Sequence, residues 1–461
     1  MPITLAQLND PIDWQKLEFK AMLKDLQANI LKGHGRPATR NVFLTVKTGQ
    51  AVAAQAGLAK VAPLVTDALT QLEDTIKFQQ SGEGGGTVIL AFLSRAGYKA
   101  LGAKAAKTPN DASFGSGMAA ASATLADPAR GAWDQGYRKA AHAMILIADS
   151  SQHLCKMEQA KILTKLGAAW SVLHIEEGQA IHDDAGEGIE HFGYVDGRSQ
   201  PLMLTQQVQK EKEAAGNPTS MKWSAFLGPA KLALIPDPAG ATSESYGSYL
   251  VYRKLGQDVA GFKEGELALS KAQIRAAKLL GVSPLPDGEL AGTMMIGRFE
   301  DGTPVIESAT AAGGPPPNNF NYASDPGGSK CPLHAHIRKT NPRDGSEVNS
   351  IMPRRGIPFG GQEGSGNDVG LLFMAYNRSI AAQFEFIQQS WANNPNFPFT
   401  GQNHGVDPII GQSATRRPSY ENCPVAHGNA GRHKGDFQQF VTMRGGEYFF
   451  APSISGLKNL T

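Results

Sequence analysis

The sequence predicts an α+β fold made of two fused ferredoxin-like units, and three observations lead to this prediction. The chain has 461 residues, which is long for one small domain and suits two fused ones. In its first half, strand and helix patterns follow the order β-α-β-β-α-β of a split βαβ unit. In its second half, strand–helix–strand order returns with long insertions. We therefore expect an N-terminal unit over residues 1–210 and a C-terminal unit over residues 211–461.

Apolar runs mark the strands of the first unit. The first run is rich in β-branched and aromatic residues, and the next two are apolar throughout, which is typical of strands covered on both faces. The predicted strands are residues 42–46, 87–93, 143–148 and 170–177. Apolar residues recur at helical spacing after Pro63, and again between Ser151 and Gly167, where a serine start and a glycine stop indicate a helix.

The second unit is less regular. The polar stretch 206–218 predicts a linker or a surface insertion. The sequence FQQFVTMRGGEYFF near the end predicts a hairpin or a pair of strands. The other expected elements are a strand near Tyr249, an amphipathic helix that ends at Gly281, a buried strand over residues 370–376 and a helix over residues 380–391.

The composition argues against several classes of protein. The net charge is +2, from 44 basic and 42 acidic residues, which argues against a dedicated binder of nucleic acid or membrane surfaces. Three cysteines are too few for a disulfide framework, and an odd number cannot all be paired, so the sequence favours a reducing compartment. No signal peptide and no bilayer-length apolar run is visible. We expect a cytoplasmic protein, although a mature secreted form would look similar. Assembly into a homo-oligomer is possible from the sequence.

The segment HFGYVDGRSQP, residues 191–201, is the first candidate for chemistry. It places Asp196 between glycines in a turn-rich stretch. Glycines allow positive φ and let a backbone approach a bulky ligand closely. The alternative is a tight turn in which Asp196 bonds its own backbone, because Asp-Gly pairs are common turn formers.

Two basic segments follow. CPLHAHIRKTNPR, residues 331–343, holds two histidines, and histidine is the commonest metal ligand. Its cysteine and histidines are spaced too closely for the usual zinc fingers. IMPRRGIPFG, residues 351–360, sets two arginines among prolines and glycines, which suits an arginine held rigidly where negative charge develops. The alternative for both segments is an exposed basic loop.

Together and in this order, these segments resemble the dye-decolourising peroxidase family. GYVDG is similar to the GxxDG motif of that family, AHIRKTNPR to its proximal histidine segment and RRGIPFG to its distal arginine segment. Similar stretches near both ends are DLQANILKGHGR, GLLFMAYNRSIAAQFEFIQQSW and GGEYFFAPSI. The resemblance spans nearly the whole chain. It implies paired ferredoxin-like units of the dimeric α+β barrel type, with haem bound in the C-terminal half, which agrees with the predicted order of elements.

The resemblance also implies an activity. The chain would be a haem-dependent peroxidase that uses hydrogen peroxide to oxidise dyes, phenols and other bulky electron donors through a ferryl intermediate. One haem b per chain is expected to bind without covalent attachment, because no CxxCH sequence is present. His336 would hold the iron as the proximal ligand, with His334 as a structural neighbour.

Further roles are carried over from matching positions. Asp196 would be the distal acid–base. Arg354, four residues before Pro358, would be the distal arginine and a contact of the cofactor, with Arg355 directed elsewhere. The apolar residues of the distal pocket would be Leu371 and Phe373, which alternate along one strand face.

Two more residues are expected near the cofactor. Arg338 is a candidate partner for a haem propionate, because guanidinium matches carboxylate geometry. Glu385 would accept the second N–H of His336, with a solvated helix acid as the alternative. Two other functions stay open: a haem-binding or iron-release protein on the same fold, and a non-haem metalloprotein that uses Cys331, His334 and His336.

Overall fold

The computed structural model describes residues 2–281, 289–313, 318–361, 368–399, 403–412, 419–429 and 431–461. Within these residues, nine strands form one sheet in the order β4-β1-β3-β2-β13-β8-β10-β9, with β7 paired to β8, and every pairing is antiparallel. The strands are β1 (Ala38–Val46), β2 (Val88–Ser94), β3 (Ala143–Asp149), β4 (Trp170–Gln179), β7 (Ile235–Pro236), β8 (Tyr246–Gln257), β9 (Ile357–Phe359), β10 (Gly370–Asn377) and β13 (Val441–Ala451).

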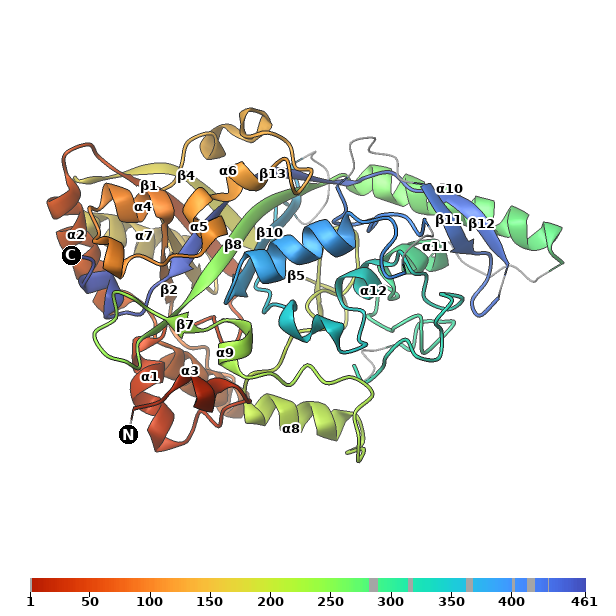
Figure 1. The fold of residues 1–461 in the computed structure, drawn as a ribbon, viewed down its shortest axis with the longest axis horizontal. Helices are drawn as coiled ribbons and strands as arrows, with labels where there is room; N and C mark the ends of the chain where they lie inside the picture. Colours follow the sequence, from red (N-terminus) through yellow and green to blue (C-terminus); the bar gives the residue numbers. More distant parts are fainter. Residues whose placement is uncertain are drawn as a thin grey trace.

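This sheet contains the predicted pair of ferredoxin-like units. The first unit contributes β4-β1-β3-β2 and the second β13-β8-β10-β9, so each unit has its own fourth strand beside its first, then its third and its second. The units meet where β2 pairs with β13, with Phe449 opposite Ser94 and Phe450 opposite Leu93. Figure 1 shows the resulting sheet running through the molecule, with the N-terminal unit on the left and α10, β11 and β12 at the far right.

The helices cover this sheet and the loops around it. They are α1 (Lys20–Asp25), α2 (Ala51–Val61), α3 (Ala68–Ser81), α4 (Arg95–Ala100), α5 (Ala112–Ser116), α6 (Met118–Ala121), α7 (Gln152–Leu166), α8 (Thr205–Ala214), α9 (Pro229–Leu232), α10 (Val259–Leu279), α11 (Glu289–Ile296) and α12 (His336–Thr340). Two small ladders pair β5 (Ile181–His182) with β6 (Gly188–Ile189) and β11 (Ser419–Pro424) with β12 (Arg432–Asp436). Across the described residues, no helix is long and apolar enough to cross a membrane.

Local chemistry explains where the predicted elements begin and end. The side chain of Ser151 caps α7 by accepting a hydrogen bond from the Leu154 N–H, and Gly167, at φ +74°, ends the helix, so this prediction is confirmed. Strands β2 and β3 are buried along their whole length, as their uninterrupted apolar character predicts. Short 3₁₀ turns lie at Leu5–Leu8, Leu17–Phe19, Ala62–Leu64, Ala105–Lys107, Arg130–Ala132, Gln135–Tyr137, Ser346–Asn349 and Gly456–Lys458.

Three expectations for the second half need correction. The stretch 206–218 is not an irregular linker but largely the helix α8, because its Gln, Lys and Glu residues are good helix formers. This helix has no buried residue, so the alternative of a surface insertion stands. The supposed hairpin near the end is the single strand β13, which a bulge between Met443 and Gly445 bends without reversing it. The helix predicted over 380–391 is present but wound in wide π-helical turns, Ala381–Glu385 and Ile387–Ala392.

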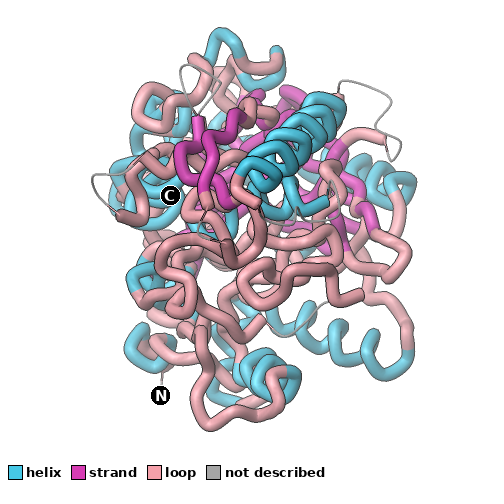
Figure 2. The backbone as a smooth tube through the Cα atoms, turned by 90° about the vertical axis from the view of Figure 1, so that its right-hand side faces the viewer, coloured by secondary structure: helices cyan, strands magenta, loops and turns pink. Residues whose placement is uncertain are grey.

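Long loops surround the second unit. Figure 2, which looks at the side of the molecule that carries this unit, shows loops in front of much of the sheet. A hydrophobic core runs continuously under both units and includes Phe43, Phe92, Tyr252 and Phe449. The sheet is therefore one rigid support, and the loops of the second unit are free to build a site on it.

Candidate active site

A large cavity lies against the outer side of the second unit. Its walls come from the loop 190–199, strands β8 and β10, helix α12, the loop 351–356 and the second π-helical segment. The empty volume, with its open mouth included, is about 1650 Å³.

His336 begins helix α12 and faces this cavity. Its Nδ1 donates a hydrogen bond of 2.8 Å to Oδ2 of Asp407, whose side chain is fully buried. The other carboxylate oxygen of Asp407 accepts from the backbone N–H groups of Ile409 and Ile410 at 2.8 and 2.9 Å. Within the described part of the chain, Nε2 of His336 makes no hydrogen bond. The imidazole is thus oriented by a fixed carboxylate and keeps one nitrogen available for a ligand.

The pKa values of this pair show how strongly the two groups are coupled. Burial alone would lower the pKa of His336, but the adjacent Asp407 carboxylate outweighs burial and holds it above its ordinary value. Burial alone would raise the pKa of Asp407, but His336 and the two backbone N–H groups hold it below its ordinary value. The arrangement therefore keeps a negative charge beside the imidazole and makes it more electron-rich.

The expected bond from His336 to Glu385 is not formed. The two carboxylate oxygens of Glu385 accept instead from the hydroxyls of Ser113, at 2.7 Å, and Tyr448, at 2.9 Å. Sequence reasoning missed Asp407 because it lies 71 residues beyond His336 in an unremarkable loop. Its only signal is an acid within the otherwise apolar stretch VDPII, and this does not single it out.

Arg338 does not face the cavity, so its expected role as a propionate partner is also corrected. Its guanidinium is buried and donates to the backbone oxygens of Asp325 and Cys331 at 2.8 and 2.6 Å. It also stacks over the ring of Tyr322. The reason is helical geometry, because residues two apart on a helix point to nearly opposite sides, so His336 and Arg338 cannot share one face.

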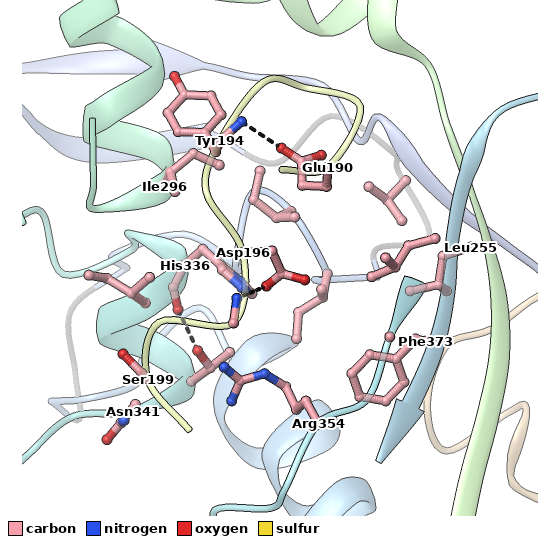
Figure 3. Close-up of a pocket in the computed structure, with 18 of the residues that line it drawn as sticks. Glu190, Tyr194, Asp196, Ser199, Leu255, Ile296, His336, Asn341, Arg354 and Phe373 are labelled. Carbon is pink, nitrogen blue, oxygen red and sulfur yellow. Dashed lines mark hydrogen bonds between the residues drawn. The ribbon is translucent and has the colours of Figure 1, made fainter. Parts of the chain in front are cut away.

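The GxxDG segment brings Asp196 to the cavity. Gly193 and Gly197 adopt φ +99° and +77°, as expected for glycines that shape a tight loop. The loop is closed by a backbone bridge between Ile189 and Val195. Oδ1 of Asp196 accepts from the Gly197 N–H at 2.6 Å, which leaves the side chain at the edge of the empty space in Figure 3. The turn interpretation and the functional one are therefore both compatible with this loop.

The two adjacent arginines point in different directions. The Arg355 guanidinium donates to the backbone oxygens of Asn29, Ile30 and Arg354, so it is directed elsewhere, as predicted. Arg354 lines the cavity, and its backbone N–H is fixed by the side chain of Gln200 at 2.9 Å. Among the described residues, its guanidinium has no hydrogen-bond partner. Burial lowers the pKa of Arg354, and the Asp196 carboxylate partly offsets this, which shows that the two charges interact.

Strand β10 supplies the apolar wall. Leu371 and Phe373 both line the cavity, as their alternation along one strand face predicts. Their cross-strand partners on β8 are Leu255 and Arg253. In Figure 3, Phe373 lies across the empty space from His336, with Asp196 and Arg354 at its edge. The structure thus assembles the imidazole, the acid, the arginine and the apolar pair around one cavity.

Further charged residues in the cavity wall were not predicted, and two of them, Arg253 and Glu190, interact closely with their surroundings. Arg253 makes a two-pronged ion pair with Asp127, at 2.6 and 2.7 Å, with both side chains almost fully buried. Burial raises the pKa of Glu190 to about 7, although hydrogen bonds from the Phe192 and Tyr194 N–H groups and from Gln257 oppose the shift. Neither residue belongs to a recognisable motif, so the sequence carried no signal for them.

The alternative of a non-haem metal site formed by Cys331, His334 and His336 finds no support. His334 is buried, and burial lowers its pKa to about 3, so it is a neutral core residue beside the site. Burial also raises the pKa of the Cys331 thiol to about 12, far from the thiolate that binds metals. In the described ranges, no group of three or more His, Cys, Asp or Glu residues is placed to hold a metal ion.

Comparison with known proteins shows which family the chain belongs to. The family described as "DyP dimeric alpha+beta barrel domain" matches residues 25–180, and "Dyp-type peroxidase, C-terminal" matches residues 229–397. The multifunctional dye peroxidase DyP2 of Amycolatopsis sp. is 39% identical over the whole of both chains. A dye-decolorizing peroxidase of Exidia glandulosa is 31% identical over 94% of this chain and 86% of its own.

Solved structures agree as well. A DyP-type peroxidase from Anabaena sp. superposes with a TM-score of 0.90 at 36% identity, over the whole of both chains. Haem binding follows from membership of this family. The chain therefore belongs to the dye-decolourising peroxidase family and is a haem peroxidase.

Proposed function

We propose that His336 binds the iron of one haem b per chain, that Asp196 transfers the peroxide proton and that Arg354 stabilises the charge of the breaking O–O bond. The observation that carries this proposal is Nε2 of His336, which makes no hydrogen bond to any described residue. Buried Asp407 holds the imidazole at the cavity, facing the space bordered by Asp196 and Arg354. Hydrogen peroxide would be the oxidant, and dyes and phenols the donors.

The residues present fit a haem group. A neutral imidazole with a hydrogen bond from its second nitrogen to a carboxylate is a common arrangement for a haem iron ligand. The apolar surfaces of Leu371 and Phe373 suit a macrocycle, and Arg354 brings to the edge of the cavity a guanidinium that has no hydrogen-bond partner among the described residues. Bound there, haem would supply an iron with an open position for peroxide and the capacity to store oxidising equivalents.

The side chains around the cavity would each have a separate role in the reaction with peroxide. Asp196 would take a proton from one oxygen of hydrogen peroxide and return it to the departing oxygen, as a positioned acid–base does. Arg354 would stabilise the negative charge that develops on the departing oxygen. Leu371 and Phe373 would exclude water, which strengthens both interactions by lowering the local dielectric.

Two broader expectations accompany this proposal. The three cysteines are all buried, and none is in a disulfide among the described residues, which is compatible with the reducing, cytoplasmic compartment predicted from the sequence. Non-covalent binding is supported by the absence of CxxCH from the sequence.

The test is haem retention by a pair of histidine variants. His336→Ala removes the proposed bond to iron, so the purified variant should carry little tightly bound haem and show a weak Soret band. His334→Ala is the matched control, because His334 lies two residues away, and it should keep haem. Retention of haem by the first variant and its loss by the second would overturn the ligand assignment.

A further inference from the structure

Aromatic rings lead from the cavity into the adjoining core. Phe373 and Phe384 both line the cavity, with ring centroids 6.2 Å apart. Phe384 meets Tyr448 in an edge-on contact with centroids 6.3 Å apart. Tyr448 pairs with Val251, two residues from the cavity residue Arg253, so it lies on the sheet face that carries the cavity. A continuous row of rings thus connects the cavity wall with a buried phenol.

The phenol of Tyr448 is bonded to a carboxylate. Only 1% of Tyr448 is exposed, and its hydroxyl donates a hydrogen bond of 2.9 Å to Oε1 of Glu385. Oε2 of Glu385 accepts from the Ser113 hydroxyl at 2.7 Å, and Glu385 is half-buried, so it borders on solvent. Phe384 and Glu385 are consecutive residues of a π-helical segment, a structure that is frequent at functional sites.

This pairing suits the oxidation of a phenol. A phenol that loses one electron becomes strongly acidic, so its proton must leave at the same time. A carboxylate 2.9 Å away is within the reach of direct proton transfer. Burial and the neighbouring Glu385 carboxylate hold the pKa of Tyr448 well above its ordinary value, so the resting side chain keeps its proton.

We propose that Tyr448 is a redox relay between the cavity and electron donors at the protein surface, with Glu385 as its proton acceptor. This inference rests on the proposed haem site. Tyr448 gives one electron to the peroxide-oxidised haem by way of Phe384, and its hydroxyl proton moves to Glu385, which leaves a neutral tyrosyl radical. A phenol or dye beside Glu385 then returns one electron, Glu385 returns the proton, and the donor is oxidised by one electron.

Tyr194 is the competing tyrosine, because it also lines the cavity and donates to a carboxylate, that of Glu266, at 2.7 Å. The ammonium of Lys263 lies 3.1 Å from that carboxylate and 5.6 Å from the Tyr194 ring. This positive charge disfavours the loss of an electron from the Tyr194 ring, although burial outweighs it at the carboxylate and holds the pKa of Glu266 above its ordinary value. Glu385 has two hydroxyl partners and no ion pair among the described residues, so the observations favour Tyr448.

The experiment is electron paramagnetic resonance on the haem-loaded protein, frozen after mixing with hydrogen peroxide in the absence of donor. Ring-deuterated tyrosine identifies tyrosyl signals by their narrowed hyperfine structure. We expect a tyrosyl radical in wild type, its loss in Tyr448→Phe and its persistence in Tyr194→Phe. Tyr249→Phe is the matched control, because Tyr249 is a buried tyrosine on the neighbouring strand whose oxygen accepts from the Asp111 N–H.

Glu385→Gln tests the proton transfer without removing the phenol. Glutamine can still accept the hydroxyl hydrogen bond but cannot take the proton. Loss of a positioned proton acceptor typically costs on the order of a hundredfold or more, so formation of the radical should slow by that factor. Oxidation of a bulky dye should fall in both Glu385→Gln and Tyr448→Phe. Because the two variants change different residues, each can test the relay if the other binds haem poorly.

The outcomes separate this inference from the proposed function. If wild type shows no spectral change with peroxide, the proposed haem site itself fails. If wild type reacts with peroxide but the radical is unchanged in Tyr448→Phe, or disappears only in Tyr194→Phe, the relay assignment is overturned and the haem site stands.

Discussion

At the residue scale, neighbouring arginines show how one step along the chain decides what a side chain does. The Arg355 guanidinium donates hydrogen bonds to the backbone oxygens of residues 29 and 30, and these bonds link the start of the first unit to the second. Arg354 turns the other way and presents its guanidinium to the cavity beside Asp196. One arginine is therefore structural and the other is available for chemistry.

This difference predicts the effects of two leucine variants. Arg354→Leu should slow the reaction with hydrogen peroxide by on the order of a hundredfold or more, the usual cost of losing one preorganised charge. Arg355→Leu should lower stability, because it leaves three carbonyl groups without their donor, and affect the peroxide rate much less. Stopped-flow absorbance of the haem-loaded variants measures the rate. Equal slowing in both variants would contradict the assignment.

Glu190 predicts a dependence of stability on pH. Its folded pKa of about 7 lies above the ordinary value of 4.5, because burial disfavours the charged form. Its protonated form therefore contributes stability that is fully present below the unfolded pKa and is lost as pH rises through about 7. One pKa unit corresponds to roughly 1.4 kcal/mol, so the effect amounts to a few kcal/mol at most.

Urea unfolding of the haem-loaded protein at several pH values between 5 and 8 checks this prediction. Glu190→Gln should flatten the loss of stability with rising pH, because the amide has no proton to lose in this range. Glu83→Gln is the control, because Glu83 is an exposed acid, and it should leave the pH profile as in wild type. A Glu190→Gln profile as steep as that of wild type would show that another group is responsible.

The candidate residues differ in how far the sequence could reveal them. His336, Asp196 and Arg354 lie in compact segments with unusual spacing of glycine, proline and charge, and the structure brings all three to one cavity. Asp407 comes from a loop that only tertiary folding places beside His336, so no local pattern marks it. The family resemblance pairs Glu385 with His336, whereas in the structure the Glu385 carboxylate, in a π-helical segment, accepts a hydrogen bond from Tyr448.

At the element scale, strand β13 shows how contacts overrule a local pattern. Two consecutive glycines predict a reversal of the chain. In the structure, a Cβ at Gly445 would lie 2.2 Å from the ring of Tyr137, and one at Gly446 would lie 2.4 Å from the carbonyl oxygen of Tyr252. The glycines therefore serve close packing inside the sheet. The strands and helices of the first unit were predictable because each follows its own periodicity, which β13 does not.

Gly445→Ala should consequently destabilise the protein. The added methyl would collide with a buried ring, and such overpacking typically costs about 1–3 kcal/mol. Gly84→Ala provides the control, because a Cβ there meets no atom within 4 Å. Urea unfolding should show a lower midpoint for Gly445→Ala than for Gly84→Ala. Equal midpoints would mean that the sheet can move away from the new methyl group.

At the scale of the whole molecule, the presence of two similar units was predictable from the sequence, but the strands through which the units contact each other were not. The order of elements repeats in the two halves, and the structure shows the same strand order in each. Their junction depends on the edge pairing of β2 with β13, and strand partners far apart in sequence leave no local signature. The site loop 190–199 crosses from the first half to the cavity of the second, so the site requires both units.

The position of β13 also has a consequence for how the protein is made. Among the described residues, β13 is the last strand of this sheet in chain order, yet it lies in the middle of the sheet, between β2 and β8. Until β13 has been synthesised, β2 has an open edge made almost wholly of apolar residues, and such edges recruit other strands. The nascent protein is therefore exposed to aggregation until β13 emerges, and the two units can join only then.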